Sequence, residues 1–107
     1  MATSLRLGTA RRDDGQVMLV AAGEIDLSNI DAFTEALVTA SREAVGGRPV
    51  TVDLSAVEYL DSAAINALFA HADRISLVAS DLLMPVLTIS GLNELVTIES
   101  GSSTAEG

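Results

Sequence analysis

The chain has 107 residues, a net charge of −9 and no cysteine. This length predicts one domain, and a hydrophobic content of 49% predicts a folded core rather than a disordered chain. Fifteen acidic residues face six arginines and no lysine, which argues against nucleic acids and anionic membranes as partners. The absence of cysteine excludes disulfides, thiolate catalysis and cysteine metal sites.

The acidity has two explanations that remain open. It favours a partner with a basic or mixed face, or it serves only to keep the protein soluble. The N-terminal segment lacks the apolar centre of a signal peptide. The most apolar stretch, residues 75–89, is interrupted and shorter than the ~20 residues of a membrane span. We therefore expect a cytoplasmic protein.

Residues 5–22 predict a β-hairpin. Apolar and polar residues alternate over residues 5–9, as in an edge strand. The apolar run 17–22 is typical of a buried strand. Asp14-Gly15 between them is typical of a hairpin turn.

A helix and a strand follow. We expect Ser28 to cap this helix, with Asp31 completing a capping box, and Gly46-Gly47 to end it. The β-branched segment 50–54 predicts a strand. Apolar residues recur at helical spacing along the helix: Ile30, Phe33, Leu37, Ala40 and Ala44.

Residues 55–61 are predicted to form a loop, and Ser62 is predicted to cap the second helix. Its apolar stripe comprises Ile65, Leu68, Phe69 and Ala72. Tyr59, Val57 and Leu60 are expected to anchor the loop to the core.

The last third predicts a buried strand over 75–79 and a helix over 80–90 that Gly91 closes. Pro85 lies deep for a first turn, so this helix is expected to start late or kink. A short strand over 95–98 follows, and residues 100–107 are interpreted as a disordered polar tail.

Strands that alternate with helices imply parallel pairs joined by right-handed crossovers. We therefore expect one α/β domain over residues 1–99, with a mixed four- to five-stranded sheet and about three helices. Loops 24–26 and 59–62 should meet at the carboxyl edge of the sheet, where functional sites gather.

Three segments of the sequence resemble one family. VDLSAVEYLDSAAINAL resembles the central signature of STAS domains, as found in anti-sigma factor antagonists. GEIDLSNIDAF and SGLNELVTI resemble the second-strand motif and the final turn and strand of the same family. The resemblance covers residues 15–99 and departs at Ala64, where the family usually has glycine. The second helix is also shorter than is usual, and the last family helix is missing.

The resemblance implies a switch without catalysis. The serine after the signature aspartate, Ser62, would be phosphorylated by the anti-sigma factor, an ATP-dependent serine kinase with a histidine-kinase-like fold. The unphosphorylated domain would bind that kinase and the phosphorylated domain would release it, which would regulate sigma-factor-dependent transcription, as in a stress response. The expected partner-binding residues are Glu24, Asp26, Ser28, Asp61, Ser62, Ala63 and Asn66.

Plainer interpretations stay open. Ser62 could be only an N-cap, Asp26 and Asp61 could be solvated loop acids, and Ala63 and Asn66 could lie on an ordinary helix face. The domain could also be a STAS-like scaffold that assembles with itself, without the switch. Neither interpretation requires a cofactor.

Enzymatic functions are disfavoured. Ser62 and His71 lie about 13 Å apart along one helix, too far for a nucleophile and its base. Asp26, Asp53 and Asp61 could hold magnesium, but phosphoacceptor domains with such acids also need a lysine, and this chain has none. The sequence contains neither a G-x-S-x-G elbow nor a phosphate-binding P-loop. We expect no metal site.

Overall fold

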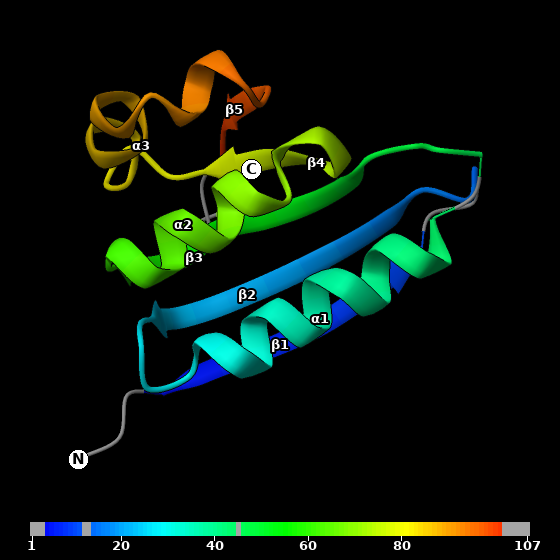
Figure 1. Ribbon diagram of the computed structural model, residues 1–107, viewed down its shortest axis with the longest axis horizontal. Helices are drawn as coiled ribbons and strands as arrows, with labels where there is room; N and C mark the ends of the chain where they lie inside the picture. The colour runs from blue at the N-terminus through cyan, green and yellow to red at the C-terminus, as the bar shows by residue number, and fades with distance from the viewer. Residues whose placement is uncertain (1–3, 12–13, 45, 102–107) are drawn as a thin grey trace.

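The computed structural model describes residues 4–11, 14–44 and 46–101. The elements follow in the order β1 (Leu5–Arg11), β2 (Val17–Ile25), α1 (Ile30–Glu43), β3 (Val50–Leu60), α2 (Ser62–Ala70), a 3-10 turn (Ala72–Arg74), β4 (Ile75–Ala79), α3 (Met84–Ser90), a second 3-10 turn (Leu92–Glu94) and β5 (Ile98–Ser100). Figure 1 shows α1 and α2 side by side along the sheet.

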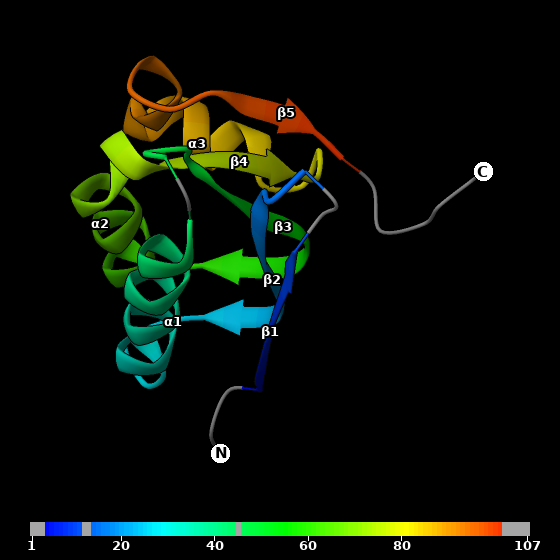
Figure 2. The ribbon, with the colours of Figure 1, turned by 90° about the vertical axis from the view of Figure 1, so that its right-hand side faces the viewer.

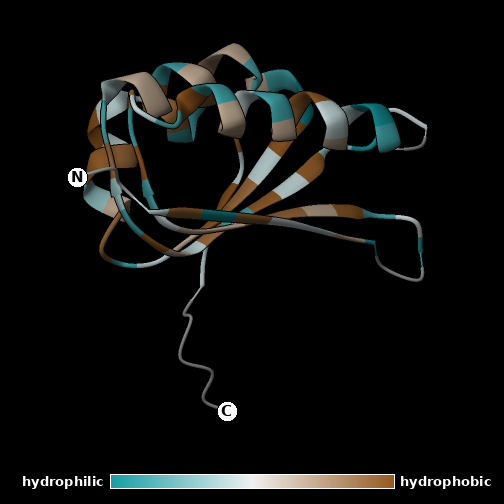
Figure 3. Cartoon of the chain, turned by 90° about the horizontal axis from the view of Figure 1, so that it is seen from below, coloured by the Kyte–Doolittle hydropathy of each residue, from teal (hydrophilic) through white to brown (hydrophobic). Residues whose placement is uncertain are grey.

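The strands form a five-stranded sheet in the order β1-β2-β3-β4-β5. β1 is antiparallel to β2, and every other pair is parallel. The helices gather on one face of this sheet (Figures 2 and 3). The predicted mixed α/β fold is therefore confirmed.

The core lies between the sheet and its helix layer. On β2, Val17, Leu19 and Ala21 alternate into it, and on α1 Phe33 and Leu37 are fully buried. Every fully buried residue among the described ones is apolar, so the core is held together by apolar packing.

The predicted loop over residues 55–61 is wrong, because β3 continues to Leu60. The register between β2 and β3 shifts between Val20 and Ala22 and again between Gly23 and Glu24. At each shift β3 carries one extra residue, as in a β-bulge. Leu54, Val57 and Leu60 therefore all face the core at a spacing of three residues. Strand alternation has a period of two, so this segment has no strand-like pattern.

The predicted capping box of the first helix is also wrong. Asn29, not Ser28, is the residue before the helix. The Ser28 hydroxyl donates to Asp26 Oδ1 at 2.6 Å instead of accepting from the helix. The predicted end of the helix is confirmed: α1 stops at Glu43, and Gly46 and Gly47 both have positive φ.

Two elements near the C-terminus are shifted. α3 starts at Met84, with Pro85 as its second residue, so the expected late start is confirmed, but Ser80 and Asp81 lie in a preceding turn. The last strand spans Ile98–Ser100 and not 95–98. Leu92 and Val96 are instead buried in and beside the turn before it.

The chain stays attached to the sheet slightly beyond the expected domain end. Ser100 pairs with Ala79 in the sheet, and the Gly101 N–H donates to the Ala79 carbonyl at 2.8 Å. The rest of the expected polar tail, residues 102–107, lies outside the described residues.

Gly23, near the end of β2, packs closely against the backbone of Ser4 before β1. Its φ is +107°, a conformation that L side chains rarely adopt. A Cβ atom at this position would overlap the carbonyl oxygen of Ser4. That carbonyl accepts a hydrogen bond from the Glu24 N–H at 3.1 Å. Only glycine fits here without moving β1 or β2.

We expect Gly23→Ala to lower the free energy of unfolding by about 2 kcal/mol or more, because it adds positive-φ strain and a backbone clash. Urea denaturation measures the change. Gly8→Ala is the matched control, since Gly8 has open space around its Cα, and it should stay within about 1 kcal/mol of wild type. Equal stabilities of the two variants would contradict this account of Gly23.

Candidate functional site

The ends of β2 and β3 lie side by side at one edge of the sheet. Ile25 pairs with Leu60, and the Asp61 N–H donates to the Ile25 carbonyl at 3.2 Å. The loop that leads into α1 and the N-terminus of α2 therefore meet there, at the end where β2 terminates in Figure 1. The predicted convergence of the two loops is confirmed.

The Asp61 carboxylate connects these two loops. Its Oδ1 accepts a hydrogen bond from the Ala64 N–H at 3.0 Å, which makes Asp61 the N-cap of α2. Its Oδ2 accepts from the Leu27 N–H at 2.9 Å, 34 residues away in sequence. One side chain thus satisfies a free helix amide and holds the neighbouring loop in place.

The predicted cap role of Ser62 is wrong, because Asp61 fills it. Ser62 is instead the first residue of α2 and is exposed. Its hydroxyl has no hydrogen bond to any residue that the structure describes. The hydroxyl of Ser62 is therefore accessible to a reagent from solvent.

The loop after β2 has its own hydrogen-bond network. Asp26 Oδ1 accepts from the N–H of Ser28 at 2.9 Å and from its hydroxyl at 2.6 Å. Asn29 Oδ1 accepts from the Asp26 N–H, and Asn29 Nδ2 donates to the Glu24 carbonyl, both at 3.0 Å. Asn29 was not among the predicted site residues, although asparagine before a helix is a known N-terminal signal. The loop is pre-shaped by side chains and not by core packing.

The remaining predicted residues lie on or near α2. Asn66 is exposed, whereas Ala63 and Glu24 are half-buried. Ala64 is fully buried. One face of α2 therefore continues from Ser62 through Asn66 to Ala70, which is also exposed.

Exposed apolar side chains surround this edge, and the sequence did not reveal them. Leu27 is 75% exposed, Tyr59 is 50% exposed and Leu82 is 66% exposed. They follow β2, end β3 and follow β4, so each lies at the carboxyl end of a parallel strand. We call these three residues the apolar edge. The expectation that Tyr59 anchors the core is wrong, whereas Val57 and Leu60 are buried as expected.

Other candidate groups are separate from this site. Asp53 Oδ1 accepts from the Ser55 N–H at 2.9 Å and from its hydroxyl at 2.6 Å, beside the first bulge of β3. His71 ends α2. The described residues contain no group of three or more histidine, aspartate or glutamate side chains placed to hold a metal ion. No helix in the described ranges is long and apolar enough to cross a membrane.

A family model described as "Mlab, STAS domain" matches residues 9–97 of the chain. No curated protein matches the sequence.

Solved structures share the fold at low identity. An anti-sigma factor antagonist from Mycobacterium paratuberculosis superposes with a TM-score of 0.79 and 22% identity, over 90% of this chain and 86% of that one. The anti-sigma factor antagonist SpoIIAA in its unphosphorylated form gives a TM-score of 0.70 at 15% identity, over 92% and 90% of the two chains. Phosphorylated SpoIIAA from Bacillus gives 0.57 at 19% identity, over 92% and 93%. These likenesses establish a SpoIIAA-like fold.

We expect Asp61→Ala to lower the free energy of unfolding by about 1–3 kcal/mol, because it removes both the cap and the link between loops. Asp61→Asn should lose less, because asparagine also caps helices. Denaturation curves measure both.

The matched control is Asp73→Ala, which removes an exposed carboxylate from the 3-10 turn after α2 and should change stability by less than about 0.5 kcal/mol. An Asp61→Ala variant as stable as this control would show that Asp61 does not hold the two loops together.

Proposed function

The chain belongs to the STAS domain family, and we propose that it acts as an anti-sigma factor antagonist switched by phosphorylation of Ser62. In this proposal the unphosphorylated domain binds an anti-sigma factor serine kinase, and phosphorylation releases it. The domain is the regulated partner and not itself an enzyme. The observation that carries the proposal is the exposed Ser62 hydroxyl, which is not used as a helix cap.

A kinase must reach the hydroxyl that it phosphorylates. Ser62 lies at the start of α2, beside the loop that contains Asp26, and nothing in the described chain hydrogen-bonds its hydroxyl. If Ser62 were the N-cap, phosphorylation would remove a helix cap and disturb the fold. Because Asp61 caps the helix instead, Ser62 can be modified without loss of that bond.

The helix end can also accommodate the phosphate. Asp61 occupies the N–H groups of Ala64 and Ile65 through its carboxylate and its carbonyl. The first-turn N–H groups of Ser62 and Ala63 have no partner within the described ranges. Free amides and the positive end of the helix dipole favour an anion at this place, so the fold need not change on phosphorylation.

Release then follows from the bulk of the phosphate and from a charge for which the docked partner has no remaining donor. A phosphate adds about −1.5 to −2 charges at neutral pH. Asp61 is the preceding residue, and its carboxylate also touches the loop that carries Asp26. A partner surface that complements Asp26 and Asp61 would meet an additional, desolvated dianion.

The apolar edge gives this docking surface an anchor. Exposed aliphatic and aromatic residues that fill partner pockets often supply most of the binding energy. Leu27 and Tyr59 combine such groups with the carboxylates of Asp26 and Asp61. The fitting partner therefore has an apolar pocket, and the hydrogen-bond donors at its rim are matched to these two carboxylates and leave none for a phosphate on Ser62.

A second candidate function is a self-assembling STAS-like scaffold without the switch. It is favoured by Ile89 on α3, which is 85% exposed, and by Leu95, which is 61% exposed. In this alternative these residues, and not the surface around Ser62, make the contact.

We expect Ser62→Glu to fold normally but to bind the anti-sigma kinase about ten-fold or more weakly, because it adds a charge beside two carboxylates. Ser62→Ala should bind like wild type and resist phosphorylation. The proteins are used to capture partners from a lysate of the source cell, and mass spectrometry identifies the partners and the phosphorylated residue.

Thr39→Glu is the charge-matched control, because Thr39 is exposed on α1 and should leave binding unchanged. If Ser62→Glu retains the same partners as Thr39→Glu, or if each protein captures only copies of itself, the scaffold alternative replaces the switch.

We expect Leu27→Ser to weaken binding to the captured kinase by about 1–2 kcal/mol, because it removes an apolar anchor. Stability should change by less than about 0.5 kcal/mol, since the side chain is exposed and the bond from the Leu27 N–H to Asp61 is preserved. Titration calorimetry and urea denaturation measure the two quantities. Leu95→Ser is the control, and greater loss of binding in that variant would place the interface elsewhere.

A further inference from the structure

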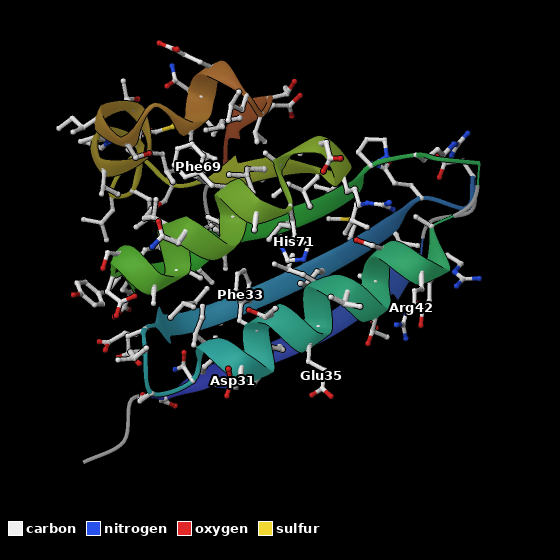
Figure 4. All side chains as sticks on the ribbon, in the orientation of Figure 1. Asp31, Phe33, Glu35, Arg42, Phe69 and His71 are labelled. Atoms are coloured by element: carbon white, nitrogen blue, oxygen red, sulfur yellow. The ribbon has the colours of Figure 1, made fainter. Side chains whose placement is uncertain are left out.

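A hollow of about 360 Å³ lies at the end of the molecule opposite Ser62. It is formed between the C-terminal parts of α1 and α2 and is lined by Val38, Ser41, Arg42, His71 and Arg74. Figure 4 shows His71 at the end of α2, on the side toward α1, and Arg42 in the last turn of α1. No acidic residue among the described ones lines this hollow.

The hollow is positively charged in an acidic protein. Two of its lining residues are arginines, whereas the whole chain has six basic residues against fifteen acids. The fold carries Arg42 and Arg74 to the same place, because α1 ends and β4 begins at the amino end of the parallel strands. Two guanidinium groups therefore line one concavity, and the exposed acids next to them in sequence, Glu43 and Asp73, are not part of its lining.

Arg74 has no other evident task, and Arg42 has only its place in the last turn of α1, where a cation favours the helix C-terminus. Within the described ranges neither guanidinium forms an ion pair or a side-chain hydrogen bond, whereas Arg11 pairs with Glu43 and Arg48 donates to the Asp14 carbonyl. Cations often stabilise the free carbonyls at a helix C-terminus. At the end of α2, however, His71 and Arg74 already occupy those carbonyls: the His71 N–H donates to Leu68 O and Phe69 O, and the Arg74 N–H to His71 O.

His71 offers one ring nitrogen to the hollow. Its Nδ1 lies 3.0 Å from the Ala67 carbonyl oxygen. A carbonyl can only accept, so Nδ1 carries a proton and Nε2 is the remaining polar atom of the ring.

Ser41 adds an unsatisfied group. Its hydroxyl oxygen is buried and has no hydrogen-bond partner, the sole such side-chain atom in the described chain. Buried polar groups are nearly always paired, and leaving one unpaired costs about 1–3 kcal/mol. A rotation of the Ser41 side chain toward the hollow would give the hydroxyl a ligand oxygen as its partner.

We propose that this hollow binds a small phosphate-bearing ligand, with Arg42 and Arg74 as the charged contacts and Ser41 and His71 as hydrogen-bonding groups. Arginine suits this role because its planar donor fork matches phosphate oxygens. The volume is near the lower end of ligand pockets, so the ligand is small. This site is separate from Ser62, and the inference does not rest on the proposed function.

Inorganic phosphate is the probe for a test by NMR on the full chain. Phosphate titration at constant ionic strength should cause saturable shifts at the backbone amides of Ser41, Arg42, His71 and Arg74. Arg42→Gln and Arg74→Gln should each weaken binding about ten-fold, the value of one charge-assisted hydrogen bond. The amide spectra of the same variants show whether they are folded.

Arg48→Gln is the matched control, because Arg48 lies outside the hollow and donates to the Asp14 carbonyl. It should bind phosphate like wild type. Shifts that do not saturate, or that are equally large in Arg42→Gln and Arg74→Gln, would overturn the proposal. Equal weakening by Arg48→Gln would also overturn it, because the effect would then be general charge screening.

Discussion

The carboxylate of Asp61 holds the end of β3, the loop after β2 and the start of α2 in one arrangement. One oxygen accepts from the Ala64 N–H and the other from the Leu27 N–H, while the Asp61 N–H bonds to the end of β2. Because Asp61 does this, Ser62 enters the helix as its first residue with a free hydroxyl, and Leu27 is held outward beside it. Asp61 therefore sets the positions of Ser62, the proposed phosphorylation site, and of Leu27 beside it.

Much of the fold could be predicted from the sequence, because the buried positions of β2, α1 and β4 follow regular periods. The predicted helix caps were wrong because several hydrogen-bonding groups compete for the same positions. The hydroxyl of Ser28 bonds to Asp26 and not to the helix, and Asp61 displaces Ser62 as a cap; several acceptors near a helix start cannot be ranked from sequence. The end of β3 was predicted wrongly as a loop for another reason. Its bulges replace the strand period of two with a spacing of three between buried residues.

The candidate site was predicted in part. Polar residues before helices indicated where Asp26, Asp61 and Ser62 would meet, because topology alone brings the ends of parallel strands together. The apolar edge was missed, because the sequence does not show whether a leucine or tyrosine near a strand end is buried or exposed. That depends on the path of the backbone. Once the bulges turn Val57 and Leu60 inward, Tyr59 is left exposed. The hollow at the opposite end was missed because its residues come from two segments that are far apart in the sequence.

The two bulges of β3 also bear on how this segment can evolve. Between Asp53 and Leu60, substitutions at the positions that point away from the core leave Leu54, Val57 and Leu60 in place. An insertion or deletion of one residue has a different effect, because it changes the phase of everything that follows. Leu60 would leave the core, and Asp61 would no longer face both Leu27 and Ala64. Natural variation in this stretch should therefore be permissive in composition and strict in length, the reverse of what is usual for a surface loop.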